Sequence, residues 1–120
     1  MKYRIFTYGT LMKGECNHHF TSGSAYIGDA VLYDYGLYDT GEGYPAAVYM
    51  KNEKICGEIY EADEKTKARM DELEETGILY DCKEVEVFMN GEKLKVLFYE
   101  YIQSTKGMKR YQSDTKWTGR

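Results

Sequence analysis

The dipeptide Asn90-Gly91 constrains the fold of this chain more than any other feature of its sequence. Both residues tolerate the positive φ angles of a type I′ turn, the favoured two-residue connection between antiparallel strands. With the turn placed there, Val85 faces Val96 on one side and Glu86 faces Lys95 on the other. One register gives an apolar face and an opposite-charge pair, so we predict a β-hairpin over these residues.

Other segments rich in aromatic and β-branched residues predict further strands, because turn residues separate them. The segment from Thr10 to Gly23 mixes glycine, asparagine, histidine and serine, and it predicts a loop with one helical turn. The predicted strands are Tyr3–Tyr8, two strands within Ala25–Tyr38 separated near Asp34–Gly36, Ala46–Met50 and Ile55–Ala62.

The segment from Asp63 to Glu75 predicts the one clear helix. Asp63 can cap the first backbone amides. Met70 and Leu73 fall together on a buried stripe at about 100° per residue. Gly77 then ends the helix. The whole pattern predicts a strand-dominated α+β fold.

The composition limits the class of protein. A chain of 120 residues fits a single domain, residues 1–120. Its 20 acidic and 16 basic residues give a net charge of -4, which disfavours nucleic acid as a partner. No apolar stretch approaches the roughly 18 residues needed to cross a bilayer, and three irregularly spaced cysteines give no disulfide framework. We therefore expect a reduced, cytoplasmic protein without a membrane partner.

Glu74 has an unusual position among the carboxylates of the predicted helix. It lies only about 70° from the Met70/Leu73 stripe, whereas the other acidic residues lie roughly 130° or more away. A carboxylate held partly out of water has a raised pKa, as a general base near neutrality requires. The alternative is a boundary glutamate that reaches solvent or bonds a nearby amide.

Tyr8-Gly9-Thr10-Leu11, at the end of the first strand, is a second candidate. Glycine allows a sharp turn there, so that the following amides can point into one cavity and bind a carboxylate or an oxyanion. The alternative is an ordinary strand-to-loop turn. A phosphate loop is excluded, because no second glycine and lysine follow at the required spacing.

The segment Cys16-Asn17-His18-His19 raises the question of a metal. Adjacent histidines rarely converge on one ion and the chain has only these two, so we expect a structural or surface role and no metal. A Cys–His nucleophilic pair is conceivable in principle. The basic tail after Gln103 could contact nucleic acid, but in an acidic protein we favour a solvated tail docked by Trp117.

Three motifs then occur in order along the chain. Tyr8 to His18 is similar to the pattern YGTL-x-x-G-x-x-N. Met70 to Glu74 is similar to LD-x-x-E with methionine replacing leucine, and Tyr80 to Val87 is similar to Y-x-R-x-x-V-x-V with Cys82 in place of arginine. Together they resemble the gamma-glutamylcyclotransferase-like family, nearest its small gamma-glutamylamine cyclotransferase and bacterial branches. The other matching segments are Gly43–Val48, Gly57–Asp63 and Trp117.

The resemblance implies a small mixed, barrel-like sheet with one main helix packed against it, and no cofactor. It implies that Glu74 is the catalytic base. The residues that it implies for substrate binding are Tyr8, Gly9, Thr10 and Leu11, whose backbone holds the carboxylate of a glutamyl group, and Tyr80.

The implied reaction is intramolecular and acts on a small-molecule gamma-glutamyl amide. The α-amine attacks the γ-carbonyl of the same molecule, and 5-oxoproline and an amine are released, with Glu74 as general base. Two alternatives are a non-catalytic small-molecule binding module with the same pocket, and an interaction protein with a tyrosine-rich surface. Glu74 favours the enzyme, because a pure binder needs no base there.

Overall fold

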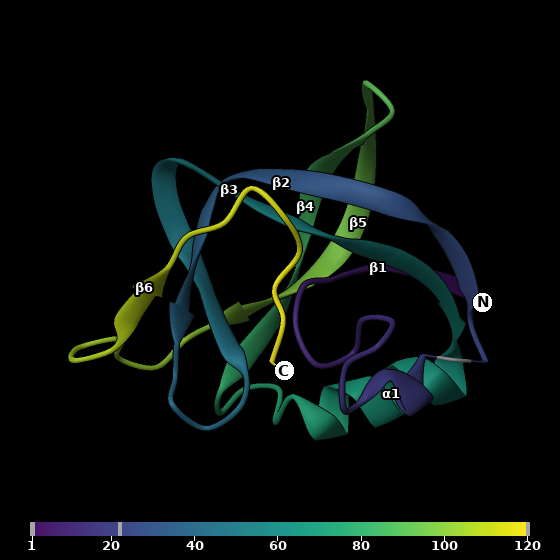
Figure 1. Ribbon diagram of the computed structural model, residues 1–120. Helices are drawn as coiled ribbons and strands as arrows, with labels where there is room; N and C mark the ends of the chain where they lie inside the picture. Colours follow the sequence, from purple (N-terminus) through teal and green to yellow (C-terminus); the bar gives the residue numbers. More distant parts are fainter. Residues whose placement is uncertain (1, 22, 120) are drawn as a thin grey trace.

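The computed structural model describes residues 2–21 and 23–119, which form a curled sheet with one α-helix below it in the view of Figure 1. Among these residues, the helices are α1 (Glu64–Leu73) and the short 3₁₀ helix η1 (His18–Phe20). This arrangement confirms the α+β class. The strands are β1 (Lys2–Thr7), β2 (Ala25–Asp39), β3 (Pro45–Asp63), β4 (Tyr80–Met89), β5 (Glu92–Tyr101) and β6 (Lys109–Tyr111).

The sheet is mixed, as expected. Its strand order is β3-β1-β5-β4-β2-β6, with β1 and β5 parallel and the other neighbours antiparallel. An additional pairing of β2 with β3 curls the sheet towards closure. β2 and β4 pair only at Val31 and Phe88, so the sheet is not a true barrel. Because β1 lies between β3 and β5, the segment that follows it starts from the interior of the sheet.

The β4–β5 hairpin has the predicted register. Val85 pairs with Val96, and Glu86 pairs with Lys95. The two residues of Asn90-Gly91 have φ angles of 52° and 81°, as a type I′ turn requires. Turn chemistry and side-chain pattern agree here, which is why the sequence determines this region well.

Two predicted breaks in strands are local irregularities instead. The segment expected to be interrupted near Asp34–Gly36 is the single strand β2, and the two strands expected within residues 46–62 are the single strand β3. Asp34 and Asn52 have φ angles of 63° and 69°, and the Asn52 amide donates a hydrogen bond to the Asp34 carboxylate at 3.0 Å. Because Asp and Asn tolerate this conformation, both strands bend there and continue.

Helix α1 begins as predicted and ends earlier than predicted. The Asp63 carboxylate accepts a hydrogen bond from the Thr66 amide at 2.8 Å and caps the first turn. The helix ends at Leu73, because Glu75 adopts a φ angle of 48° that does not continue a right-handed helix. Glu74 is therefore the C-cap, and its side chain leaves from the helix end. No helix within the described ranges is long and apolar enough to span a membrane.

The C-terminal tail, yellow in Figure 1, folds back across the sheet. Trp117 is buried, which confirms that it docks the tail. The tail is less solvated than expected, because it also contributes the unpredicted strand β6, which pairs with β2. Near its end the Gly119 amide donates a hydrogen bond to the Glu15 carboxylate at 3.0 Å. The tail thus reaches the loop that follows β1.

Candidate active site

A small cavity lies where the end of β1 meets the end of α1. Its volume is about 20 Å³, which is room for about one water molecule. The structure brings all six site residues expected from the sequence to its wall: Tyr8, Gly9, Thr10, Leu11, Glu74 and Tyr80. The wall also contains five residues to which the sequence analysis gave no site role: Phe6, Thr7, Tyr44, Pro45 and Tyr99.

The backbone from Gly9 to Leu11 forms one side of the cavity. The Met12 amide donates a hydrogen bond to the Gly9 carbonyl at 3.1 Å, which closes a turn around these residues. Within the described ranges, no hydrogen bond uses the amides of Gly9, Thr10 or Leu11 as donors. These three N–H groups can therefore donate to an acceptor such as a carboxylate.

Glycine is required at position 9 for a reason other than the expected one. The φ angle of Gly9 is not positive, so a left-handed backbone does not explain it. A Cβ atom at this position would lie 2.9 Å from Cδ and 3.0 Å from Cγ of Pro45. The constraint is the close approach of Pro45, which begins β3 and closes the cavity on that side.

Buried tyrosines form most of the remaining wall. The Tyr8 hydroxyl donates to the Tyr99 carbonyl at 2.5 Å, and the Tyr80 hydroxyl donates to the Pro45 carbonyl at 2.7 Å. The Tyr99 hydroxyl donates to Asp71 Oδ1 at 2.7 Å. Burial is the main cause that raises the pKa of all three phenols. They stay protonated at neutral pH and hold the wall in place as donors.

Glu74 is the only carboxyl group among the described residues that line the cavity. The residue is partly buried, and burial raises the pKa of its carboxyl from 4.5 to about 7. Tyr8, Tyr80 and Tyr99 line the same cavity as Glu74. After burial, the charge of Glu74 contributes to the raised pKa of Tyr8 and Tyr80. A group with this pKa both accepts and donates a proton near neutrality.

Hydrogen bonds on either side of Glu74 hold its backbone. The Glu74 amide donates to the Met70 carbonyl at 2.9 Å. The amide and hydroxyl of Thr76 donate to the Asp71 carbonyl at 3.1 and 2.9 Å. The Asp71 carboxylate also pairs with Lys67 at 2.7 Å and accepts the Tyr99 hydroxyl. The helix end that carries Glu74 is thus tied to β5.

The histidine segment does not contribute to this cavity. His18 Nδ1 lies 3.2 Å from the Leu11 carbonyl and 3.0 Å from Thr21 Oγ1, which fits the structural role expected for it. Among the described residues, no group of three or more His, Cys, Asp or Glu side chains is arranged to hold a metal ion. The Cys16 thiol is exposed and is not part of the cavity wall.

The predicted hairpin register contained a signal for one of the residues that were missed. It places Tyr99 opposite Cys82, two residues along β4 from Tyr80, and the structure has this pairing. Cys82 is half-buried, and burial raises the pKa of its thiol. Tyr44 and Pro45 lay inside a motif that carried the family resemblance, but nothing in their sequence spacing connected them with Gly9.

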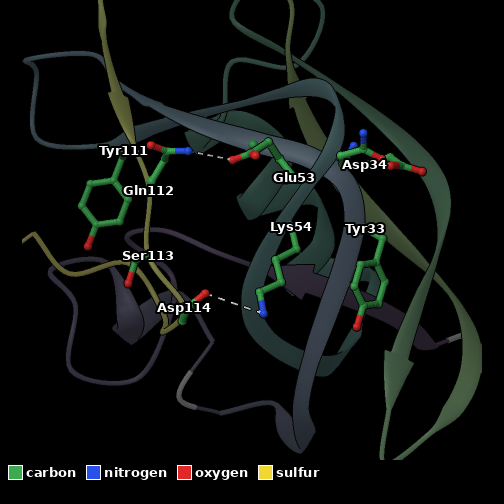
Figure 2. A pocket seen from close by; sticks show the side chains of 10 residues that line it. Tyr33, Asp34, Glu53, Lys54, Tyr111, Gln112, Ser113 and Asp114 are labelled. Carbon is green, nitrogen blue, oxygen red and sulfur yellow. Dashed lines mark hydrogen bonds and ion pairs between the residues drawn. The ribbon is translucent and has the colours of Figure 1, made fainter.

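A larger groove lies elsewhere, between the bend of β2 and β3 and the C-terminal tail. Figure 2 shows Lys54 directed at Asp114, and Gln112 directed at Glu53. The groove has a volume of about 710 Å³, and most of its lining residues are polar or charged. It contains none of the candidate site residues from the sequence. Its lining residues are Tyr33, Asp34, Gly36, Asn52, Glu53, Lys54, Tyr111, Gln112, Ser113 and Asp114.

Comparisons with known proteins identify the family. A family model described as gamma-glutamyl cyclotransferase, AIG2-like, matches residues 5–119, so the chain belongs to this family. The Gamma-L-glutamyl-butirosin B gamma-glutamyl cyclotransferase of Niallia circulans is 38% identical over 93 residues, which are 72% of this chain and 59% of that protein. The chain therefore spans little more than half the length of that relative.

Solved structures show the same fold. The solution structure of YtfP from Escherichia coli, named a gamma-glutamylcyclotransferase family protein, is 30% identical, with a TM-score of 0.71 over 93% of this chain and 94% of that chain. An AIG2-like protein from Mus musculus is 23% identical, with a TM-score of 0.80 over 93% of this chain and 87% of that chain. The fold expected from the family resemblance is thereby confirmed.

Proposed function

We propose that this chain is a gamma-glutamyl cyclotransferase of the gamma-glutamylamine type, which releases 5-oxoproline and an amine from a gamma-glutamyl amide. One observation carries the proposal: the Glu74 carboxyl shares a small cavity with the three available amides of Gly9, Thr10 and Leu11. The amides suit the α-carboxylate of a glutamyl group, and the carboxyl suits proton transfer near neutrality. Membership of the family supports the same reaction class.

The reaction follows from this arrangement. With the substrate carboxylate on the amides, Glu74 takes a proton from the α-ammonium, and the freed amine attacks the γ-carbonyl carbon. A new C–N bond closes a five-membered ring, and the bond from the γ-carbon to the leaving nitrogen breaks. Glu74 passes the protons released by the α-nitrogen to the leaving nitrogen. Well-oriented intramolecular reactions gain about 7–11 kcal/mol, so the protein mainly folds the substrate and moves protons.

Substrate entry requires a wall of the cavity to move, because about 20 Å³ does not hold a glutamyl group. Tyr44 is the wall that we expect to move. It is partly exposed, and it lies on the connection between β2 and β3, next to Pro45. Its ring centroid is 6.4 Å from that of Tyr80 and both rings line the cavity, so moving Tyr44 widens the cavity.

Negative charge near Tyr44 supports the amine type of substrate. Burial is the largest cause of the raised pKa of the Tyr44 phenol, followed by Tyr101 and then by the carboxylates of Glu42 and Glu75. Glu42 lies on the same connection as Tyr44, two residues before it, and the charges of both carboxylates act on the Tyr44 phenol. They favour a leaving group that departs as a cation over one that carries a carboxylate of its own.

A panel of gamma-glutamyl compounds tests the proposal. It pairs gamma-glutamyl amines, including a gamma-glutamyl polyamine and the gamma-glutamyl ε-amide of lysine, with gamma-glutamyl amino acids, and 5-oxoproline release is measured for each. We expect release from the amines first. Binding of these compounds without any release would favour the alternative, a non-catalytic binding module.

A further inference from the structure

Glu58 is a buried carboxylate that the proposed reaction does not use. It lies in β3 and is 2% exposed. Its Oε1 atom accepts a hydrogen bond from the Tyr60 hydroxyl at 2.9 Å, and its Oε2 atom pairs with Lys116 Nζ at 2.7 Å. Buried carboxylates are costly unless a cation and donors surround them, and here the cation comes from the C-terminal tail.

The same residue holds both ends of the segment that carries the three available amides. Thr7, the last residue of β1, donates from Oγ1 to the Glu58 backbone carbonyl at 3.0 Å. Lys13, beyond the turn, donates from its amide to Glu58 Oε1 at 2.9 Å. Residues 8–12 are therefore fixed at both ends to one residue of β3.

The tail is attached to this region at more than one point. Lys116 Nζ contacts Glu58 and also Asp29 Oδ1, at 3.3 Å. Trp117 is buried beside it, and the Gly119 amide donates to the Glu15 carboxylate, two residues after Lys13. In Figure 1 the yellow tail ends close to the purple loop that follows β1.

We propose that Glu58 and Lys116 are positioning residues for the amides of Gly9 to Leu11, with the C-terminal tail acting as a strap that completes the site. The ligand in this inference, a carboxylate on those amides, rests on the proposed function. Without Lys116, the charge of Glu58 is unbalanced beside a segment that has to bind an anion. The Glu58 side chain is then drawn towards water and away from the Lys13 amide.

Lys116→Met tests the strap, because it removes the cation and keeps the length of the side chain. Lys116→Arg is the conservative rescue. Lys54→Met is the matched control. Lys54 also forms an ion pair with the tail, with 3.8 Å between its Nζ and Asp114 Oδ1, but it lies in the groove of Figure 2. We expect Lys116→Met to raise KM for an accepted gamma-glutamyl substrate about tenfold and to leave kcat nearly unchanged, the usual size of coupling inside one ion-pair network.

The double variant of Glu58→Gln with Lys116→Met makes the test sharper. The side-chain oxygen of the new amide can still accept from the Lys13 amide and needs no cation. The double variant should therefore reverse most of the increase in KM that Lys116→Met causes. If Lys116→Met behaves like Lys54→Met, or if the double variant binds no better than Lys116→Met, the positioning role is overturned.

Amide hydrogen exchange separates this inference from the proposed function. In Lys116→Met we expect faster exchange at the Lys13 amide and unchanged exchange in the β4–β5 hairpin. If the parent protein releases no 5-oxoproline from any compound of the panel, the proposed function fails. The exchange comparison still decides the strap, because unchanged exchange at Lys13 would overturn it.

Discussion

The cavity at Glu74 and the groove of Figure 2 differ both in volume and in the surroundings of their carboxylates. The groove has a volume of about 710 Å³ and the cavity about 20 Å³. In the groove, Glu53 pairs with Arg110 at 2.8 Å, and Asp114 is 96% exposed. In the cavity, Glu74 is partly buried, and among the described residues it has no ion pair. The smaller hollow is therefore the better candidate for proton transfer, because only there is a carboxyl kept from water without a cation.

The difference follows from how each hollow is built. The groove lies between the side chains of a strand bend and those of the tail, and water reaches both. The cavity lies between a backbone turn after β1 and the C-terminal end of α1. Backbone amides are fixed donors that cost little to preorganise, and a helix end can place one side chain inward. The comparison predicts that equivalent changes in the two hollows have very different effects.

The largest expected effect is that of Glu74→Gln, with Glu53→Gln as the matched control. The Glu74 change keeps the size and hydrogen-bonding capacity of the side chain but removes the proton acceptor. General-base contributions are about 10²–10⁴-fold, so turnover should fall by at least that range while substrate affinity changes little. Turnover of Glu53→Gln should match the parent protein. A Glu74→Gln protein with near-full 5-oxoproline release would show that Glu74 is not the base.

A bulky residue in place of Gly9 should have the next largest effect. The side chain of Gly9→Val would collide with Pro45, push the turn aside and misdirect the amides. A displacement of this kind costs roughly 10²-fold in kcat/KM, and calorimetry should show weaker binding. Gly23→Val is the control, because a Cβ there meets nothing within 4 Å. Equal affinity in the two variants would mean that the amides of this turn do not hold the substrate.

The pH dependence of kcat/KM should also distinguish the cavity from the groove, with a smaller effect than the two substitutions above. If the ionised Glu74 is the base, kcat/KM should rise about tenfold per pH unit below its pKa and level off above it. The midpoint of this limb should lie near pH 7, since burial raises the pKa of Glu74 to about 7. Glu53→Gln should keep the limb, and the residual activity of Glu74→Gln should lack it. A limb that persists in Glu74→Gln would assign the titration to another group.

The sequence predicts some of these regions better than others, for physical reasons. The β4–β5 hairpin was predicted residue by residue, because Asn90-Gly91 fixes the turn and the turn fixes the pairs. Glu74 was selected from helical periodicity, which still holds at this C-cap because Glu74 keeps a right-handed helical φ of -80° and its amide bonds to the Met70 carbonyl. Contacts between distant segments have no such local signal. The approach of Pro45 to Gly9, like the pairing of Lys116 with Glu58, becomes visible only when the strands are assembled.

The smallest expected effect is on the free energy of unfolding. Here Glu74→Gln, which is harmful to turnover, should stabilise the protein. The Glu74 carboxyl has a folded-state pKa of about 7, above its ordinary value of 4.5, so between these pH values the folded chain holds a proton that the unfolded chain releases. The free energy of unfolding therefore falls as pH rises through this window, and the full penalty is present above about pH 7. Glu74→Gln removes the penalty, which amounts to about 1–3 kcal/mol once partial exposure is allowed for. Urea unfolding at pH 8 should show the variant to be more stable than the parent, and this gain should shrink towards pH 5. A gain of the same size at both pH values would mean that the stabilisation does not come from the ionisation of this carboxyl.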